Sequence, residues 1–249
     1  PLKYYTNNLF SLTNLLNELK NLNKEINFIF SSSATVYGDP KILPITESEP
    51  IKKAESPYGN TKQIGEEIIK DLVNSSSNFN AISLRYFNPI GAHPSALIGE
   101  LPIGIPQNLV PYITQTAIGK RNELTVFGDN YLTRDGSCIR DYIHVVDLAK
   151  AHIKSLEKLI KESSKNYYDA FNIGTGKGTS VLELISCFES VSGKKLNFRI
   201  GERRKGDIAK CFADVSKANE LLNWKSKHSI EDALLSSWNW EKHIKNEKL

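Results

Sequence analysis

Hydrophobic residues recur every three or four positions near the start of the chain, from Tyr4 to Leu22. This spacing places the leucines of the segment on one face and predicts an amphipathic helix. The next segment, INFIFSSS (Ile26–Ser33), is a short apolar run that ends abruptly in polar residues. Such a run is typical of a buried strand in a parallel sheet.

The same order of elements then repeats. The segment SPYGNTKQIGEE predicts the start of a helix at Pro57, because Ser56 suits the N-cap and the first helical position needs no N–H. The apolar run AISLRYF (Ala81–Phe87) predicts a second buried strand. Alternating helices and strands predict a doubly wound α/β sheet, in which ligands bind beyond the carboxyl ends of the strands.

The pattern is less regular from Asn88 to Arg140, where Gly and Pro are frequent. Later segments predict helices and strands again: a helix at Leu109–Gly119, a strand at Leu124–Phe127, a strand or turn and a long helix within Asp141–Leu159, a strand, glycine turn and helix within Ala170–Val191, and a helix at Ile230–Trp240. Ser180 and Glu183 have the spacing of a capping box at the start of one of these helices.

Charge and cysteine usage exclude several classes of protein. The 249 residues carry a formal net charge of +4, and the lysines are scattered among acidic residues, so we expect no nucleic-acid partner. The cysteines, Cys138, Cys187 and Cys211, have no CxxC spacing, and the histidines form no HExxH motif. We therefore expect neither disulfides nor a metal site, and a cytoplasmic location. No apolar run approaches membrane-spanning length, so we expect no membrane partner.

Tyr58 and Lys62 are the first candidates for chemistry, since four residues separate them and they share one helical face. Spacing alone favours a structural tyrosine beside a solvated lysine. However, Ser33 adds a hydroxyl at the end of the preceding strand. A nearby ammonium lowers the pKa of a tyrosine, which is otherwise near 10, and a serine can share its proton. Together the three residues predict an acid–base site.

The glycine-rich segment GTGKGTS (Gly174–Ser180) does not match a dinucleotide-binding fingerprint, because Thr179 occupies the position of the third glycine. It does not match a Walker A motif either, since Phe171 stands where the first glycine is required. The segment predicts a strand-to-helix turn, with phosphate binding as the less favoured alternative.

Seven segments span nearly the whole chain in order: FSSSATVYGDP, SPYGNTK, LRYFNPIGAHPS, GIPQNLVPYI, RDYIHVVDLA, FNIGTGKGTSVLE and RRKGDIAKCFAD. Together they resemble the UDP-glucose 4-epimerase family of the extended short-chain dehydrogenase/reductase superfamily. The resemblance implies an NAD-dependent, reversible epimerisation at C4 of UDP-glucose and UDP-galactose through a 4-keto intermediate. It also implies a role in galactose metabolism and a homodimer.

The resemblance implies roles for particular residues. Tyr58 would be the active-site base, Lys62 its partner, and Ser33 the hydroxyl bonded to the reacting sugar oxygen. The residues implied to bind the cofactor are Asn7, Ser31, Tyr58, Lys62 and Phe87. Those implied to bind the UDP-sugar are Ser33, Tyr58, Asn88, Asn108, Thr125, Val126, Phe127, Arg140, Arg204, Asp207 and Cys211.

The resemblance also implies two domains. Residues 1–87 and 143–175 would be the remaining part of an NAD-binding Rossmann domain, and residues 88–142 and 176–249 a smaller carboxyl-terminal α/β domain that binds the UDP-sugar. The family's amino-terminal G-x-x-G-x-x-G loop and first strands are absent, the chain opens at Pro1, and it contains no methionine. We therefore expect a segment of a longer protein, with the front half of the Rossmann domain missing.

Several alternatives stay open. Cys211 stands where some family members carry tyrosine, so we hypothesise that UDP-N-acetylhexosamines are accepted too. The chain could instead be another nucleotide-sugar 4-epimerase, or a catalytically silent UDP-sugar-binding fragment, because the glycine-rich NAD loop is missing. A dehydratase is disfavoured because Ala34 and Thr35 replace its Asp-Glu pair. Arg85, within a predicted strand, is expected to be structural and satisfied by a carboxylate or by carbonyls.

Overall fold

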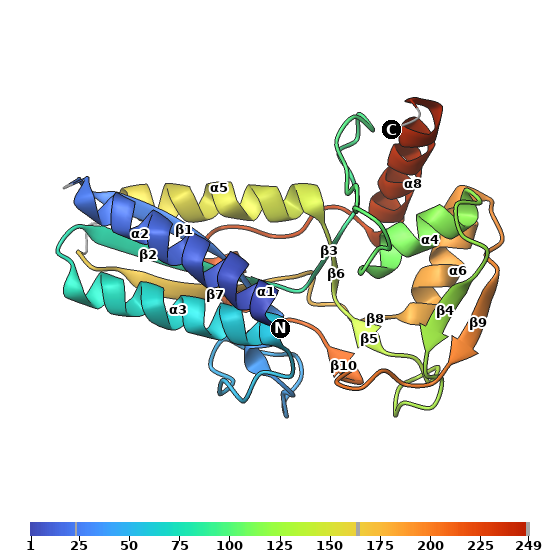
Figure 1. Ribbon diagram of the computed structural model, residues 1–249, viewed down its shortest axis with the longest axis horizontal. Coiled ribbons are helices and arrows are strands. Elements are labelled where there is room, and N and C mark those ends of the chain that lie inside the picture. The colour runs from blue at the N-terminus through green and yellow to red at the C-terminus, as the bar shows by residue number, and fades with distance from the viewer. Residues whose placement is uncertain (23, 163–164, 248–249) are drawn as a thin grey trace. The chain divides into compact units, whose positions relative to one another are not determined.

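The structure is a computed structural model that describes residues 1–22, 24–162 and 165–247 (Figure 1). The chain divides into two compact units, and each is formed from separate stretches of sequence. The first unit contains Pro1–Phe87, Lys150–Ile173 and Ala213–Lys225. The second contains Asn88–Ala149, Gly174–Phe212 and Ser226–Leu249.

The first unit is built on a parallel sheet with the strand order β1-β2-β7, formed by Ile26–Ser33, Phe79–Tyr86 and Tyr168–Ile173. Ser33 pairs with Tyr86, and Tyr86 pairs with Ile173, so the carboxyl ends of the three strands are aligned. The helices are α1 (Leu2–Tyr5), the π-helical turn η1 (Thr6–Phe10), α2 (Ser11–Asn21), the 3-10 turn η2 (Ala34–Tyr37), α3 (Pro57–Ser75), α5 (Val145–Lys161) and α7 (Ser216–Leu221).

Helices lie on both faces of this sheet. One face packs against α2 and α3 through a buried cluster of Leu12, Leu16, Ile69, Val73, Phe79 and Ala81. Successive side chains of a strand point to opposite faces. Accordingly, Arg85 contacts Glu66 of α3, whereas the next residue, Tyr86, packs its ring against His152 of α5. The predicted doubly wound α/β fold is therefore confirmed.

Local signals set the start of α3 as predicted. The Ser56 hydroxyl accepts a hydrogen bond from the Gly59 N–H at 3.1 Å, and Pro57 occupies the first turn. Farther along, the helix approaches β1 closely at Gly65, where an added Cβ would lie 2.7 Å from Cζ of Phe30. This contact brings the helix that carries Tyr58 and Lys62 directly onto the strand that ends at Ser33.

The segment Ala213–Lys225 packs with the first unit, whereas the sequence-based division placed it with the UDP-sugar-binding domain. The reason is a set of contacts that the sequence pattern does not show. Ala213 forms a parallel bridge with Ile45. Lys217 Nζ, on α7, donates to Asp169 Oδ1 at 2.5 Å and to the Ala170 carbonyl at 3.0 Å, both on β7.

In the part of the chain that the structure describes, the second unit contains three small sheets and three helices that lie wholly within it. Its sheets are β10-β5-β8 (Lys210–Cys211, Ile139–Arg140, Thr179–Ser180), β3-β6 (Asn88–Ile90, Tyr142–His144) and β4-β9 (Leu124–Phe127, Phe198–Gly201). Its helices are α4 (Leu109–Ala117), α6 (Val181–Ser192) and α8 (Ile230–Glu247). The core between them is formed by Ile90, Val110, Ile113, Leu124, Val126, Tyr142, Leu184, Ile185, Phe188, Leu196, Ala233, Leu234 and Trp238.

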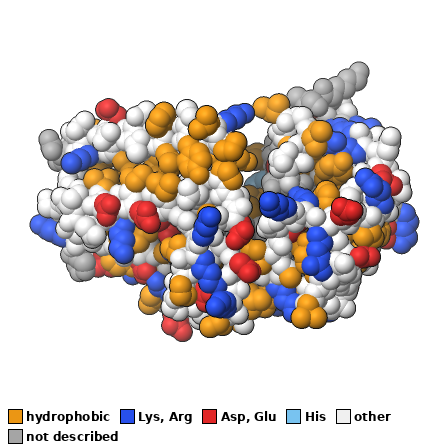
Figure 2. Space-filling model, turned by 60° about the horizontal axis from the view of Figure 1, so that its bottom comes forward, with side chains coloured by type: hydrophobic (Ala, Val, Ile, Leu, Met, Phe, Trp, Pro, Cys, Tyr) orange, Lys and Arg blue, Asp and Glu red, His pale blue; other side chains and the backbone are white. Residues whose placement is uncertain are grey.

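Two further sequence predictions concern this unit and the surface. The capping box at the start of α6 is confirmed, since the Ser180 and Glu183 side chains each accept from the other's backbone N–H. Among the described residues, none of the helices combines the length and the apolar character that crossing a bilayer requires. Lys, Arg, Asp and Glu side chains are interspersed on the face seen in Figure 2.

Candidate active site

The first unit brings Ser33, Tyr58 and Lys62 together at the carboxyl end of β1. Tyr58 lies in the first turn of α3, and Lys62 follows one turn later. Lys62 Nζ donates to the Ser31 carbonyl at 2.7 Å and lies 5.5 Å from the centre of the Tyr58 ring. The Ser33 hydroxyl lies close enough to the Tyr58 phenol to lower its pKa. A hydroxyl, a phenol and an ammonium thus form one half-buried polar cluster.

The electrostatics of this cluster differ from the sequence prediction. Burial raises the pKa of the Tyr58 phenol; the nearby Ser33 hydroxyl opposes this effect, and Tyr4 adds to it. Burial likewise lowers the pKa of Lys62. The lysine was predicted to lower the pKa of the phenol, but its ammonium group is bonded to the Ser31 carbonyl, and burial is the larger influence on Tyr58.

The other predicted cofactor-binding residues have more varied surroundings. Ser31 is exposed on β1; burial raises the pKa of the Tyr86 phenol, and the nearby Ser31 hydroxyl opposes this effect. Asn7 is exposed on η1, and its side-chain amide donates to Asn8 Oδ1 at 3.1 Å. Phe87 follows β2 and is buried, with its N–H donating to the Ile173 carbonyl at 3.2 Å. Ser31 therefore borders the cluster directly, and Asn7 lies on the helical segment next to α3.

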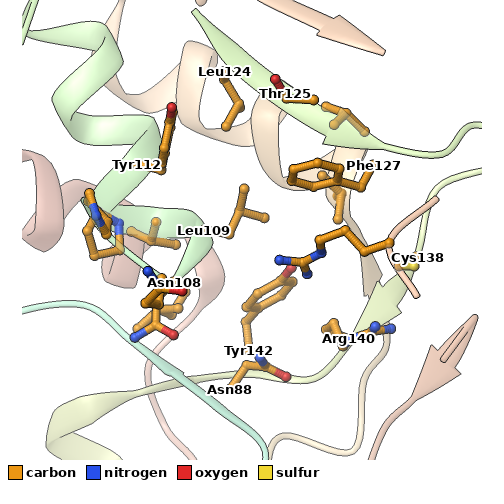
Figure 3. A pocket seen from close by; sticks show the side chains of 18 of the residues that line it. Asn88, Asn108, Leu109, Tyr112, Leu124, Thr125, Phe127, Cys138, Arg140 and Tyr142 are labelled. Atoms are coloured by element: carbon orange, nitrogen blue, oxygen red, sulfur yellow. The ribbon is translucent and has the colours of Figure 1, made fainter. Parts of the chain in front are cut away.

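The second unit contains a pocket with a volume of about 410 Å³ (Figure 3). Its lining includes eight of the residues that the sequence assigned to the UDP-sugar: Asn88, Asn108, Thr125, Val126, Phe127, Arg140, Arg204 and Asp207. In Figure 3, Thr125 and Phe127 on β4 face Asn108 and Tyr112 at the start of α4 across the cavity. Residues more than 100 positions apart in the sequence thus line one cavity.

One carboxylate connects the two arginines of this pocket. Arg204 donates from Nε to Asp207 Oδ2 at 2.9 Å and from Nη2 to Oδ1 at 3.2 Å. Arg140 Nη2 lies 3.9 Å from the same Oδ1, and the Arg204 guanidinium lies 4.8 Å from the centre of the Phe127 ring. Two guanidinium groups held this way present the planar, multiple donors that phosphate oxygens bind best.

Neighbouring contacts hold two asparagines of the pocket. Asn108 Nδ2 donates to Glu100 Oε1 at 2.7 Å, just before α4 begins. The Asn88 backbone N–H donates to the Asp141 carbonyl at 2.9 Å. Cys211 lies outside the pocket lining, on β10, where it pairs in register with Arg140. Burial raises the pKa of its thiol to about 11, so it is neutral at pH 7.

The family model described as GDP-mannose 4,6 dehydratase matches residues 1–236. The UDP-glucose 4-epimerase of Drosophila melanogaster is 48% identical over 246 residues, which are 99% of this chain and 70% of the relative. The chain belongs to the UDP-glucose 4-epimerase family. It also belongs to the family that the dehydratase model describes.

Two solved structures of UDP-glucose 4-epimerases show the same fold. The enzyme from Stenotrophomonas maltophila, with bound NAD and formylated UDP-arabinopyranose, has a TM-score of 0.94 and 44% identity; the match covers 99% of this chain and 72% of the other. The enzyme from Bifidobacterium longum, in complex with NAD+ and UDP, has a TM-score of 0.92 and 47% identity over the same shares. The predicted family is thus confirmed.

Within this UDP-glucose 4-epimerase family fold, sequence reasoning missed two aromatic residues of the pocket. Tyr112 follows Asn108 by four positions, which places both on one face at the start of α4. Tyr142 pairs in register with Asn88, and burial strongly raises the pKa of its phenol. The helical spacing from Asn108 was a usable signal for Tyr112. For Tyr142, the only signal in the sequence was its position two residues after Arg140.

The glycine-rich segment forms the predicted turn, and the Asp141 carboxylate accepts hydrogen bonds from its backbone N–H groups. The Thr175 N–H and hydroxyl donate to Asp141 Oδ1 at 2.8 and 2.6 Å, and the Gly176 N–H donates to Oδ2 at 3.0 Å. Asp141 is fully buried. In this member of the UDP-glucose 4-epimerase family, the donors that a phosphate would use are therefore already engaged by the protein.

Proposed function

We propose that the chain takes part in the reversible, NAD-dependent epimerisation of UDP-glucose and UDP-galactose at C4, as part of galactose metabolism. The observation that carries this proposal is the cluster of Ser33, Tyr58 and Lys62 at the carboxyl end of β1. A phenol beside a hydroxyl and an ammonium suits proton transfer to and from a sugar oxygen. The pocket of the second unit supports a UDP substrate, since it combines two arginines with amide and aromatic side chains.

The residues at the end of β1 fit a nicotinamide cofactor. The Lys62 ammonium has three donors, and the Ser31 carbonyl uses one of them, so it can also bond ribose hydroxyls. Tyr58 and Ser31 offer further hydroxyls beside it. Lys62, Tyr58 and Ser31 would hold the nicotinamide ribose, with Asn7 and Phe87 as the other proposed contacts. When bound, NAD supplies the hydride acceptor and donor for C4 of the sugar.

In the proposed mechanism, the protein moves one proton and orients the sugar. Tyr58 Oη removes the proton of the 4-hydroxyl as C4 becomes a ketone, and later returns a proton when the 4-keto sugar is reduced on its other face. Ser33 donates to the reacting oxygen or to the phenol and so keeps the proton path short. Arg140 and Arg204 bind the diphosphate, so that the hexose can turn while the nucleotide stays bound.

A 4,6-dehydratase would also oxidise C4, but elimination requires an acid and a base next to the strand end. The chain has Ala34 and Thr35 there, and Ala34 is buried. This favours epimerisation over dehydration. Another nucleotide-sugar 4-epimerase and a catalytically silent UDP-sugar-binding protein are the remaining alternatives, because both would keep the pocket of the second unit.

The test is to add UDP-galactose and NAD+ to the chain and to follow the sugar nucleotides by proton NMR, with Tyr58→Phe as the control. UDP-glucose formed by the wild type and not by Y58F would support the proposal. A 4-keto-6-deoxy product would overturn it in favour of a dehydratase. If the wild type binds UDP in calorimetry but neither product appears, the silent binding protein is favoured, and the same assay should be repeated with the full-length protein.

Three narrower proposals accompany this function. Cys211 is smaller than the tyrosine that the resemblance implies at this position, so we propose that UDP-N-acetylhexosamines are substrates too. Undetectable turnover of UDP-N-acetylglucosamine by an enzyme that is active on UDP-galactose would exclude this. We also propose a homodimer, because the α1–α2 segment exposes Leu2, Phe10 and Leu15 and hydrophobic side chains gather on the first unit (Figure 2). Light scattering tests the dimer. The third proposal is a cytoplasmic location, which cell fractionation tests.

A further inference from the structure

A buried ion pair lies behind the Ser33–Tyr58–Lys62 cluster. Glu66, on α3, accepts two hydrogen bonds from Arg85 of β2: Nε to Oε1 at 2.9 Å and Nη2 to Oε2 at 2.6 Å. Its Oε1 also accepts from the Ser32 hydroxyl at 2.5 Å. The Glu66 and Arg85 side chains are only 5% and 7% exposed. The expectation that a carboxylate satisfies Arg85 is confirmed.

The position of this pair in the fold connects it to the proton-transferring residues. Glu66 lies one helical turn beyond Lys62 and two turns beyond Tyr58, on the same face of α3. Ser32 immediately precedes Ser33, and it is the register partner of Arg85 on the adjacent strand. One carboxylate therefore joins the strand that ends at Ser33, the helix that carries Tyr58, and the central strand of the sheet.

The pair extends into a longer buried network, in which each group has a defined partner. Arg85 Nη1 donates to Tyr37 Oη at 3.0 Å, and Tyr37 Oη donates to Asn172 Oδ1 at 2.7 Å. Asn172 Nδ2 in turn donates to the Ile45 carbonyl at 2.8 Å. Burial raises the pKa of Tyr37 to about 12, so its hydroxyl keeps the proton that it donates.

The energetics of such a pair favour a geometric role over a stabilising one. Burying two charges costs about as much as their attraction returns, and apolar residues of similar size can often replace a buried pair without loss of stability. Bidentate guanidinium–carboxylate bonds, in contrast, allow few relative orientations. The network therefore restricts the position of α3 relative to the end of β1 more than it stabilises the fold.

We propose that Glu66 and Arg85 are positioning residues, which hold the Ser33 hydroxyl next to the Tyr58 phenol through Ser32 and through helix α3. For catalysis this inference rests on the proposed epimerase function, but the positioning itself does not. Without the carboxylate, Ser32 loses its partner and the end of β1 gains freedom relative to α3. The Ser33 hydroxyl then moves away from the phenol, and Tyr58 loses a group that favours its ionised form.

The experiment compares three variants with the wild type. Ser32→Ala removes one hydrogen bond and leaves the ion pair. The double variant Glu66→Met with Arg85→Met removes both charges while keeping the volume of the site filled. Glu241→Gln is the control: Glu241 is also a buried carboxylate, 2.9 Å from Lys120 Nζ and 3.1 Å from the Thr114 hydroxyl, but it belongs to the second unit.

Three measurements separate positioning from stability. The Tm reports stability. The ¹³Cζ chemical shift of Tyr58 in tyrosine-labelled protein reports the surroundings of its hydroxyl and requires neither cofactor nor activity; Tyr58→Phe assigns the signal. The kcat and KM for UDP-galactose report catalysis and should be measured on the full-length protein. Tyr4, Lys62 and Tyr86 are the ionisable neighbours of Tyr58, and all three are unchanged in every variant.

We expect the Tyr58 shift to change in S32A and in the double variant but not in E241Q. The kcat should fall about fivefold in S32A, as for one lost hydrogen bond, and about 10²-fold in the double variant, with KM unchanged. A wild-type Tyr58 shift in the double variant would overturn the proposal. So would a double variant in which both the kcat and the Tm return to the wild-type values. If the wild type does not epimerise UDP-galactose, the proposed function fails, and the Tyr58 shift still decides the positioning.

Discussion

Replacement of Asp141 by Asn tests how the glycine turn and the pocket are held. Asp141 is fully buried and contacts the turn at Thr175–Gly176, and its neighbours in sequence, Arg140 and Tyr142, line the pocket. Its two oxygens accept three hydrogen bonds of 2.6 to 3.0 Å from the turn. An asparagine keeps the shape but has only one oxygen, so its NH₂ must face at least one of these donors.

The expected loss follows from this geometry. In its better orientation, the amide keeps the bonds to Thr175 and loses the bond to Gly176, which is worth about 1.5–3 kcal/mol for an ionised acceptor. The two remaining bonds weaken because the acceptor is neutral, whereas removal of a buried charge offsets part of the loss. We expect a net destabilisation of about 3 kcal/mol, and hence a fall in Tm of roughly 6–12 °C for a protein of this size.

Calorimetric melting of the wild type and D141N measures this difference. Asp71→Asn is the matched control, since it makes the same chemical change at an exposed position of α3 and should shift Tm by no more than about 1 °C. D141N should also bind UDP more weakly, because Arg140 and Tyr142 flank the altered side chain. A Tm of D141N within about 2 °C of the wild type would refute the claim that the carboxylate holds the turn.

Two further predictions concern single arginines. Arg204→Ala should weaken UDP binding about 10- to 100-fold in calorimetry, the equivalent of one or two charge-assisted bonds. Arg199→Ala is the control and should leave UDP binding unchanged, because Arg199 lies in an exposed ion pair with Glu123. Equal effects of the two changes would contradict the assignment of Arg204 to the diphosphate. The hydrogen bond with Arg134 lowers the pKa of Glu183 from 4.5 to about 2. A lowered folded-state pKa contributes stability that is present above pH 4.5 and is lost as the pH falls towards about 2. Urea unfolding should therefore show this loss of stability in the wild type and a smaller loss in Arg134→Ala. The same pH dependence of stability in both proteins would argue against a stabilising Arg134–Glu183 pair.

The sequence by itself determined the local structure around the proposed active site. The N-cap at Ser56, the strand Ile26–Ser33 and the shared face of Tyr58 and Lys62 depend on residues within a few positions of one another, and the structure has all three. The family followed from motifs of this kind, in order along the chain. Spacing and capping act over short distances, so a linear pattern contains the information that sets them.

Only the tertiary structure decided the surroundings of these groups. Burial raises the pKa of Tyr58, and the Lys62 ammonium donates a hydrogen bond to the Ser31 carbonyl. The pKa shift of Tyr58 is therefore opposite in direction to the one predicted from spacing. The carboxylate that satisfies Arg85 proved to be Glu66, which lies on α3, 19 positions earlier in the sequence. Desolvation and hydrogen-bond partners arise when segments distant in the sequence pack together, and no periodicity of the chain encodes them. The acid–base properties of this site are therefore set by packing around residues that the sequence could only name.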